Sequence, residues 1–145
     1  MLLKDIFTPG AVCCGPNTTA QAAARLMRER HVGDLLVVAE DQEPIGIVTD
    51  RDITIEVLGQ DLDPAKVTLR DFMRRPVVMG HTSEDTSQVL ERMKIHGVRR
   101  IPVMEGSRLV GIISLDDLIR QFALDAGALA DVVAREQGRE QRTRR

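Results

Sequence analysis

The sequence predicts a mixed α/β (α+β) fold made of two copies of one β-α-β-β-α unit. Three observations support this prediction: a phrase that occurs twice, amphipathic stretches that alternate with short β-branched runs, and an apolar content of 43% in 145 residues. The phrase "GIVTDRDI" at 46–53 returns as "GIISLDDL" at 111–118. One unit is too small to cover strands that are apolar on both faces, so we expect the two units to pack through their sheets as a pseudo-twofold pair.

Two offsets align the copies. An offset of 65 residues places Asp52 on Asp117, whereas an offset of 66 places Met27 on Met93, so one residue is gained or lost between the first helix and the next strand. We therefore predict repeat 1 at residues 1–62, a linker at 63–66, repeat 2 at 67–125, and a C-terminal helix with a basic tail at 126–145.

The first copy contains the elements of the unit in order. A short helical turn and a short β-branched run come first, and Asn17 and Thr18 are the N-cap candidates for the amphipathic helix that follows. Two apolar strands joined by the turn-like "EDQEP" come next, and a second helix begins at Thr49. We predict these elements at Leu3–Phe7, Ala11–Val12, Ala20–Arg30, Leu35–Ala39 and Ile45–Val48.

The second copy repeats this order, with Thr82 and Ser83 as cap candidates and a second helix that begins at Ser114. After it, residues 123–136 have an amphipathic helical pattern suited to covering the module or contacting a partner. Residues 135–145 are charged, basic and without apolar side chains, so we expect them to be disordered. The elements of this copy are predicted at Leu69–Met73, Val77–Met79, Thr86–His96, Arg100–Met104 and Leu109–Ile113.

Composition limits the classes of function. The net charge of −2 gives no general attraction to nucleic acid or to anionic membranes, and three Phe with no Trp or Tyr offer few faces for stacking bases. No apolar run is long enough to cross a membrane, and the N-terminus has no signal-peptide pattern. The adjacent Cys13 and Cys14 form no disulfide framework, which favours a reducing cytoplasmic setting. His and Cys residues show no metal-ligand spacing, so we predict no metal site.

The repeated phrase has two interpretations. Thr49 and Asp52 have the spacing of a capping box, as do Ser114 and Asp117, and this alone explains them as helix starts. Their matching positions after a strand and a glycine favour a binding site instead. A helix N-terminus attracts phosphate, an aspartate accepts both hydroxyls of a ribose, and Arg51 is placed to pair with phosphate. The sequence contains no P-loop and no nucleophile paired with His, so no catalytic residue is predicted.

These motifs resemble a tandem pair of cystathionine-beta-synthase (CBS) domains, often called a Bateman module, of the short stand-alone bacterial type. The resemblance covers about residues 1–125 and adds "VGDLLVV" at 32–38, "VRRIPV" at 98–103, and the pair "DIFTPGAV" and "DFMRRPVV" to the repeated phrase. It implies two clefts between the repeats that bind AMP, ADP, ATP, NAD or S-adenosylmethionine as a regulatory ligand, with no required cofactor. It also implies a disc-shaped homodimer.

The resemblance assigns roles to particular positions. Thr49 with Asp52 and Ser114 with Asp117 would hold the two ligands, each aspartate on a ribose. The strands that line the base would be Leu36-Val37-Val38 and Ile101-Pro102-Val103. The copies differ at two corresponding positions: the first has Arg51 where the second has Asp116, and Val37 where the second has Pro102. The two sites are therefore expected to differ in affinity. Arg99 or Arg100 at a strand start is either exposed edge charge or a phosphate contact.

The leading hypothesis is therefore a non-enzymatic sensor that binds an adenosyl ligand. The alternative is a structural or interaction protein that recruits an unidentified protein partner through its C-terminal helix and tail. A weaker hypothesis is a redox sensor that uses Cys13 or Cys14. Contact with nucleic acid or a membrane is not expected.

Overall fold

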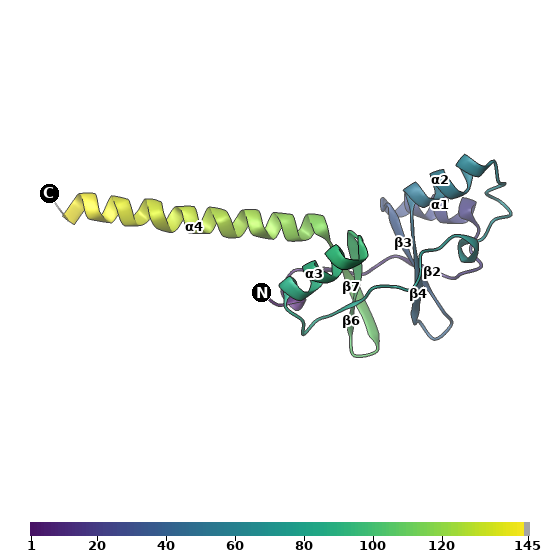
Figure 1. The fold of residues 1–145 in the computed structure, drawn as a ribbon, viewed down its shortest axis with the longest axis horizontal. Coiled ribbons are helices and arrows are strands. Elements are labelled where there is room, and N and C mark those ends of the chain that lie inside the picture. The colour runs from purple at the N-terminus through teal and green to yellow at the C-terminus, as the bar shows by residue number, and fades with distance from the viewer. Residues whose placement is uncertain (144–145) are drawn as a thin grey trace.

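The structure is a computed structural model that describes residues 1–143. Two small sheets form the middle of the body, and one long helix extends away from it (Figure 1). This arrangement confirms the predicted mixed α/β class. The elements are η1 (Leu3–Asp5), β1 (Thr8–Pro9), β2 (Cys13–Cys14), α1 (Ala20–Arg30), β3 (Asp34–Val38), β4 (Pro44–Thr49), α2 (Asp50–Glu56), η2 (Leu58–Gln60), η3 (Leu69–Asp71), β5 (Gly80–His81), α3 (Thr86–His96), β6 (Arg100–Glu105), β7 (Arg108–Ser114) and α4 (Leu115–Thr143), where η marks a 3-10 turn.

The two sheets share one topology. In repeat 1, β2 runs parallel to β3 and β3 antiparallel to β4; in repeat 2, β5 runs parallel to β6 and β6 antiparallel to β7. The register pairs Asp34 with Thr49 and, equivalently, Arg100 with Ser114. The first strand of each repeat lies later than predicted, at 13–14 and 80–81 rather than at 11–12 and 77–79. The β-branched residues precede the ladder, and the pairing begins beyond them.

The segments that begin each repeat are exchanged between the repeats. Leu3 is fully buried in the core of repeat 2, and β1 adds an edge strand to that sheet by pairing with β7. Conversely, Leu69 and Met73 belong to the core of repeat 1, and Arg74 forms a β-bridge with Ile47. Figure 1 accordingly shows the N-terminus beside α3, the first helix of repeat 2. Each repeat is therefore completed by the segment that begins the other repeat.

Both faces of each central strand are buried. Val37 points into the core of repeat 1, and Ile101 into that of repeat 2. On the opposite faces, Leu36 and Met104 are 2% and 6% exposed. A strand alternates its side chains between faces, so both faces of these sheets are covered, as the apolar strands predicted.

The helix caps correct the predicted candidates. Thr19, rather than Asn17 or Thr18, caps α1 by accepting from the N–H of Ala22. Asp85, rather than Thr82 or Ser83, caps α3 in a capping box with Gln88. Thr82 is instead tied into the body, because its N–H donates to Met104 and its carbonyl accepts from Lys4.

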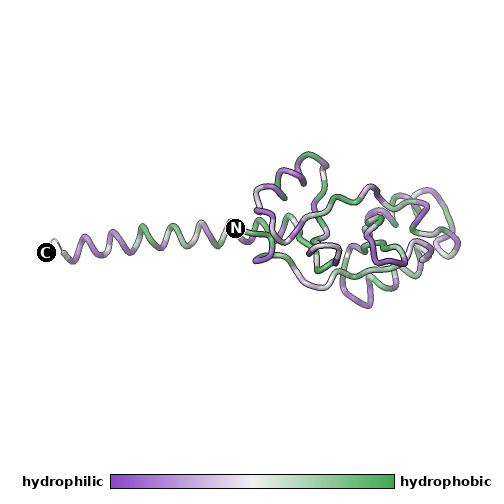
Figure 2. Tube along the Cα trace, turned by 90° about the horizontal axis from the view of Figure 1, so that it is seen from below, coloured by the Kyte–Doolittle hydropathy of each residue, from purple (hydrophilic) through white to green (hydrophobic). Residues whose placement is uncertain are grey.

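The C-terminal part is one continuous 29-residue helix, α4, that begins as the second helix of repeat 2. The prediction of disorder from residue 135 is wrong for 135–143, and residues 144–145 lie outside the described chain. Arg, Glu and Gln favour helix, and Asp131 precedes Arg135 by four residues, a spacing that stabilises helices. Figure 2 shows hydrophobic turns in the middle of this rod and a hydrophilic C-terminal end. No helix within residues 1–143 combines the length and apolarity needed to cross a membrane.

Candidate functional site

The repeated phrase forms the same capping box in both repeats. The N–H of Thr49 donates to Oδ2 of Asp52 at 2.9 Å, and the N–H of Asp52 donates back to Oγ1 of Thr49 at 3.1 Å. Ser114 and Asp117 make the same two bonds at 2.9 and 3.1 Å. The capping interpretation therefore holds for both motifs, and each aspartate keeps one oxygen, Oδ1, outside the box.

The remaining oxygen of Asp52 is held by an arginine. Arg74 donates to Oδ1 from Nε at 3.1 Å and from Nη2 at 3.0 Å. The Asp52 side chain is only 7% exposed, whereas that of Arg74 is 59% exposed. Asp52 is the one charged residue in the buried class among the described residues, and a buried carboxylate requires such partners.

A cleft of about 480 Å³ opens at the start of α2 and receives residues from both repeats. Repeat 1 supplies Thr49 and Arg51, and the exchanged segment supplies Arg74. Repeat 2 supplies Arg99 and Arg100 from the start of β6. Asp50 also lines the cleft, and Arg74, Arg99 and Arg100 each have an aspartate partner, so the cleft is not simply positive. It offers four guanidinium groups whose N–H donors suit an anion.

Arg100 also joins the two repeats. Its Nε lies 3.1 Å from Oδ1 of Asp34. Asp34 occupies the equivalent position of repeat 1, so the ion pair joins two residues that the pseudo-twofold symmetry relates. Burial raises the pKa of Asp34; Arg100 opposes this shift, and Asp50 adds to it.

The equivalent positions around Ser114 carry no arginine. Arg51 corresponds to Asp116 by its place in the phrase, and Arg100 corresponds to Asp34. Arg74, which bridges to Ile47, corresponds to Thr8, which pairs with Ile112. Arg99 corresponds to Gly33, because the carbonyl of each accepts a hydrogen bond from the first residue of the following helix. The charge difference expected from Arg51 and Asp116 alone therefore extends to four positions.

Acidic groups around the second motif have arginine neighbours at the surface. Asp117 lies 3.4 Å from Arg120, and Asp116 lies 3.6 Å from Arg99. The side chain of Asp117 is only 18% exposed. The Arg99–Asp116 pair is largely exposed, so it contributes little to the stability of the fold. Arg99 thus partly offsets the charge of Asp116.

The strand residues assigned to the base divide between two faces. Val37 and Ile101 are fully buried in the helix-side cores, so their side chains do not line a cleft. Val38 and Pro102 alternate with them and lie on the faces turned away from those cores. Of the four, Val38 lines a hollow in the structure.

The glycine of each phrase makes room for the exchanged segment. A Cβ on Gly46 would lie 2.5 Å from Sδ of Met73, and a Cβ on Gly111 would overlap the carbonyl oxygen of Thr8 and lie 2.6 Å from Cδ2 of Phe7. Each glycine therefore allows another segment of the chain itself to approach closely.

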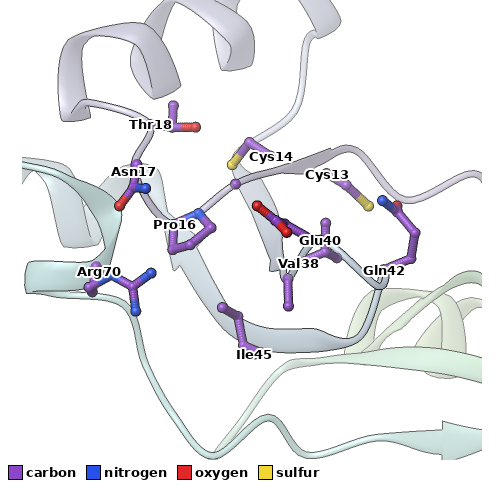
Figure 3. A pocket seen from close by; sticks show the side chains of 12 residues that line it. Cys13, Cys14, Pro16, Asn17, Thr18, Val38, Glu40, Gln42, Ile45 and Arg70 are labelled. Atoms are coloured by element: carbon purple, nitrogen blue, oxygen red, sulfur yellow. The ribbon is translucent and has the colours of Figure 1, made fainter.

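A second, larger hollow of about 1000 Å³ lies in repeat 1 (Figure 3). Glu40 and Arg70 reach toward it from different segments, and Cys13 lies beside Gln42 (Figure 3). Burial raises the pKa of the Cys13 thiol and of the Cys14 thiol, so less thiolate is present than on a free cysteine, which is unfavourable for redox sensing. This hollow contains none of the residues of the repeated phrase.

Sequence reasoning missed Arg74 and Asp34. Arg74 lies in "DFMRRPVV", a segment predicted to belong to repeat 2, and only the exchange of segments brings it to Asp52. Asp34 opens a strand and carries no motif, although its position equivalent to Arg100 was available from the offset of 66. Among residues 1–143, no cluster of His, Cys, Asp and Glu is arranged to hold a metal ion.

Comparison with known proteins agrees with this geometry. The CBS domain model matches residues 3–59 and 69–124. Hypoxic response protein 1 of Mycobacterium tuberculosis is 37% identical over 119 residues, which cover 82% of this chain and 83% of that protein.

Two solved structures are similar over nearly the same length. A crystal structure of Hypoxic Response Protein I with two coordinated zinc ions has a TM-score of 0.73 at 35% identity, covering 83% of this chain and 98% of the other. The CBS domain pair of protein MJ0100 in complex with 5′-methylthioadenosine and S-adenosyl-L-methionine has a TM-score of 0.77 at 28% identity, covering 86% and 98%. Two matched segments, two equivalent sheets and this length of similarity lead to one conclusion: the chain belongs to the CBS-domain family and is a tandem CBS-domain pair of the short stand-alone type.

Proposed function

We propose that this chain is a non-enzymatic sensor whose first cleft binds an adenosyl ligand that carries phosphate, such as AMP, ADP, ATP or NAD. The observation that carries the proposal is a buried carboxylate, Asp52, at a helix start beside a cleft with four arginines. The carboxylate suits the two hydroxyls of a ribose. The arginines suit phosphate oxygens, which they bind through charge-assisted hydrogen bonds.

The relatives support the adenosyl part of the ligand. MJ0100, whose CBS pair has the same fold as this chain, binds 5′-methylthioadenosine and S-adenosylmethionine. Neither of these carries phosphate, so the arginines at the first cleft argue for a different member of the same ligand class here. Around Ser114 and Asp117 the equivalent positions lack arginine, and we infer that phosphate binds there more weakly.

Isothermal titration calorimetry tests the proposal. ADP, NAD and S-adenosylmethionine are titrated into the wild-type chain and into Asp52→Asn and Asp117→Asn, a matched pair because both aspartates make the same capping box. ADP or NAD should bind the wild type, and Asp52→Asn should weaken that binding at least tenfold while Asp117→Asn has the smaller effect. Absence of binding by the wild type, or equal effects of the two substitutions, contradicts the proposal. Thermal melts establish that both variants fold.

We further propose a homodimer in which the α4 helices of two copies pair. An apolar stripe runs along α4 at alternating spacings of four and three residues, the spacing of a coiled coil. Most of it is exposed; Leu129, for example, is 69% exposed. A seven-residue repeat matches a second copy of itself, which is why we assign this surface to a second chain. The stripe consists of Leu115, Ile119, Phe122, Ala126, Leu129 and Val133.

Light scattering on two variants tests the helix pairing. Leu129 lies in the stripe and Leu124 lies outside it, yet they are 69% and 68% exposed. Leu129→Glu should convert the dimer to a monomer, and Leu124→Glu should not. A dimer that survives Leu129→Glu contradicts pairing through the stripe. A monomeric wild type favours the alternative in which this helix recruits another protein.

A further inference from the structure

Arg74 occupies the part of Asp52 that the proposed ligand needs. One oxygen of Asp52 is used by the capping box, and the other accepts both bonds from Arg74. Asp52 itself does not line the cleft, whereas Arg74 does. A ribose can therefore bond to Oδ1 of Asp52 only if the guanidinium of Arg74 moves away.

The backbone of Arg74 stays in place during such a movement. Its N–H donates to the carbonyl of Ile47 at 3.0 Å, and its carbonyl accepts from the N–H of Ile47 at 3.2 Å. The side chain, in contrast, is 59% exposed. The guanidinium can swing from Asp52 into the cleft while the Cα atom remains fixed to β4.

We propose that Arg74 makes the first cleft selective for phosphorylated ligands over the bare nucleoside. This inference depends on the proposed function. A nucleoside that bonds to Asp52 separates the ion pair and brings no anion of its own to replace the lost carboxylate. A nucleotide offers phosphate oxygens in the same cleft, so Arg74 exchanges the carboxylate for a phosphate. The new hydrogen bonds offset the cost of separating Arg74 from Asp52.

The second repeat lacks this device. The residue that pairs with Ile112 where Arg74 pairs with Ile47 is Thr8, which carries no charge. Within residues 1–143, the arginine paired with Asp117 is Arg120, three residues along the same helix, at 3.4 Å. Selection through displacement of an arginine from the exchanged segment is therefore specific to the first cleft.

The test compares adenosine with ADP in calorimetry on the wild type, Arg74→Ala and Arg75→Ala. Arg75 is the neighbouring exposed arginine and gives the same loss of charge, so Arg75→Ala serves as the control and should leave both affinities within twofold. Arg74→Ala should tighten adenosine binding and weaken ADP binding. The Kd for adenosine divided by the Kd for ADP should therefore fall about tenfold or more.

Each other outcome contradicts a different claim. If Arg74→Ala weakens ADP and leaves adenosine unchanged, Arg74 is an ordinary phosphate contact and the displacement is wrong. If both ligands lose affinity equally, Arg74 acts only on the fold and the inference also fails. If the wild type binds neither ligand, the proposed function fails, and the inference fails with it.

Discussion

Substituting the two repeated glycines by alanine tests whether the start segments are exchanged between the repeats. In Gly111→Ala the new methyl overlaps the backbone oxygen of Thr8 and lies 2.6 Å from Cδ2 of Phe7. Favourable carbon–carbon contacts are about 3.5–4.0 Å, so β1 must leave its place on β7. In Gly46→Ala the methyl meets the side chain of Met73, which can adjust more easily than backbone.

Overpacking costs about 1–3 kcal/mol, and we assign Gly111→Ala the upper end because the obstacle is a peptide carbonyl. Alanine also restricts the unfolded chain, which returns about 0.4–1 kcal/mol. The net loss is then about 2 kcal/mol, or a fall in Tm of about 4–8 °C for a chain of this size. Gly46→Ala should cost less. Gly127→Ala, in the interior of α4 with nothing within 4 Å, should stabilise by up to about 1 kcal/mol.

Thermal and urea unfolding of the three variants measure these differences. The expected order of stability is Gly127→Ala, wild type, Gly46→Ala, Gly111→Ala. If Gly111→Ala melts at or above the wild-type temperature, the segment of residues 7–9 is not packed on β7, and the exchange described above is wrong.

Three further outcomes follow from the packing and the charges. Leu69→Ala should destabilise the fold by about 2–5 kcal/mol in urea unfolding, since Leu69 is fully buried in the core of repeat 1; a loss below about 1 kcal/mol would contradict that placement. The hydrogen bond from Arg92 holds the pKa of Glu84 below its ordinary value, so ionised Glu84 stabilises the fold at neutral pH and this contribution disappears as the pH falls through the lowered pKa. Glu84→Gln should therefore lower Tm at about pH 7, and this loss should shrink as the pH falls through the lowered pKa of Glu84; a pH-independent loss would refute the ion pair as its cause. Because burial raises the pKa of the thiols of Cys13 and Cys14, iodoacetamide should label them more slowly than free cysteine at neutral pH; labelling as fast as that of free cysteine would contradict it.

Local patterns in the sequence predicted the helices and central strands well. The bounds of α1 and α3 match the prediction, because an amphipathic period of 3.6 is visible without tertiary information. The capping boxes at Thr49 and Ser114 also follow from spacing alone. The sequence does not predict the extension of α4 through residues 135–143, because this segment lacks apolar residues; strong helix formers nevertheless continue a helix that has already begun.

The site was predicted less completely, for a physical reason. Thr49, Arg51 and Asp52 are close in sequence, so a motif shows them together. Arg74 reaches Asp52 only through the exchange of segments, which no local pattern reports. Val37 was assigned to the base by resemblance, whereas strand alternation turns it into the core.

A crystal structure of the chain grown with ADP tests the central claim most directly. We predict the ribose hydroxyls on Oδ1 of Asp52, the phosphates between Arg51 and Arg99, and the guanidinium of Arg74 moved from Asp52 to a phosphate. ADP ordered only at Ser114 would contradict the assignment of the first cleft. ADP bound in the first cleft with Arg74 still bonded to Asp52 would contradict the role given to Arg74.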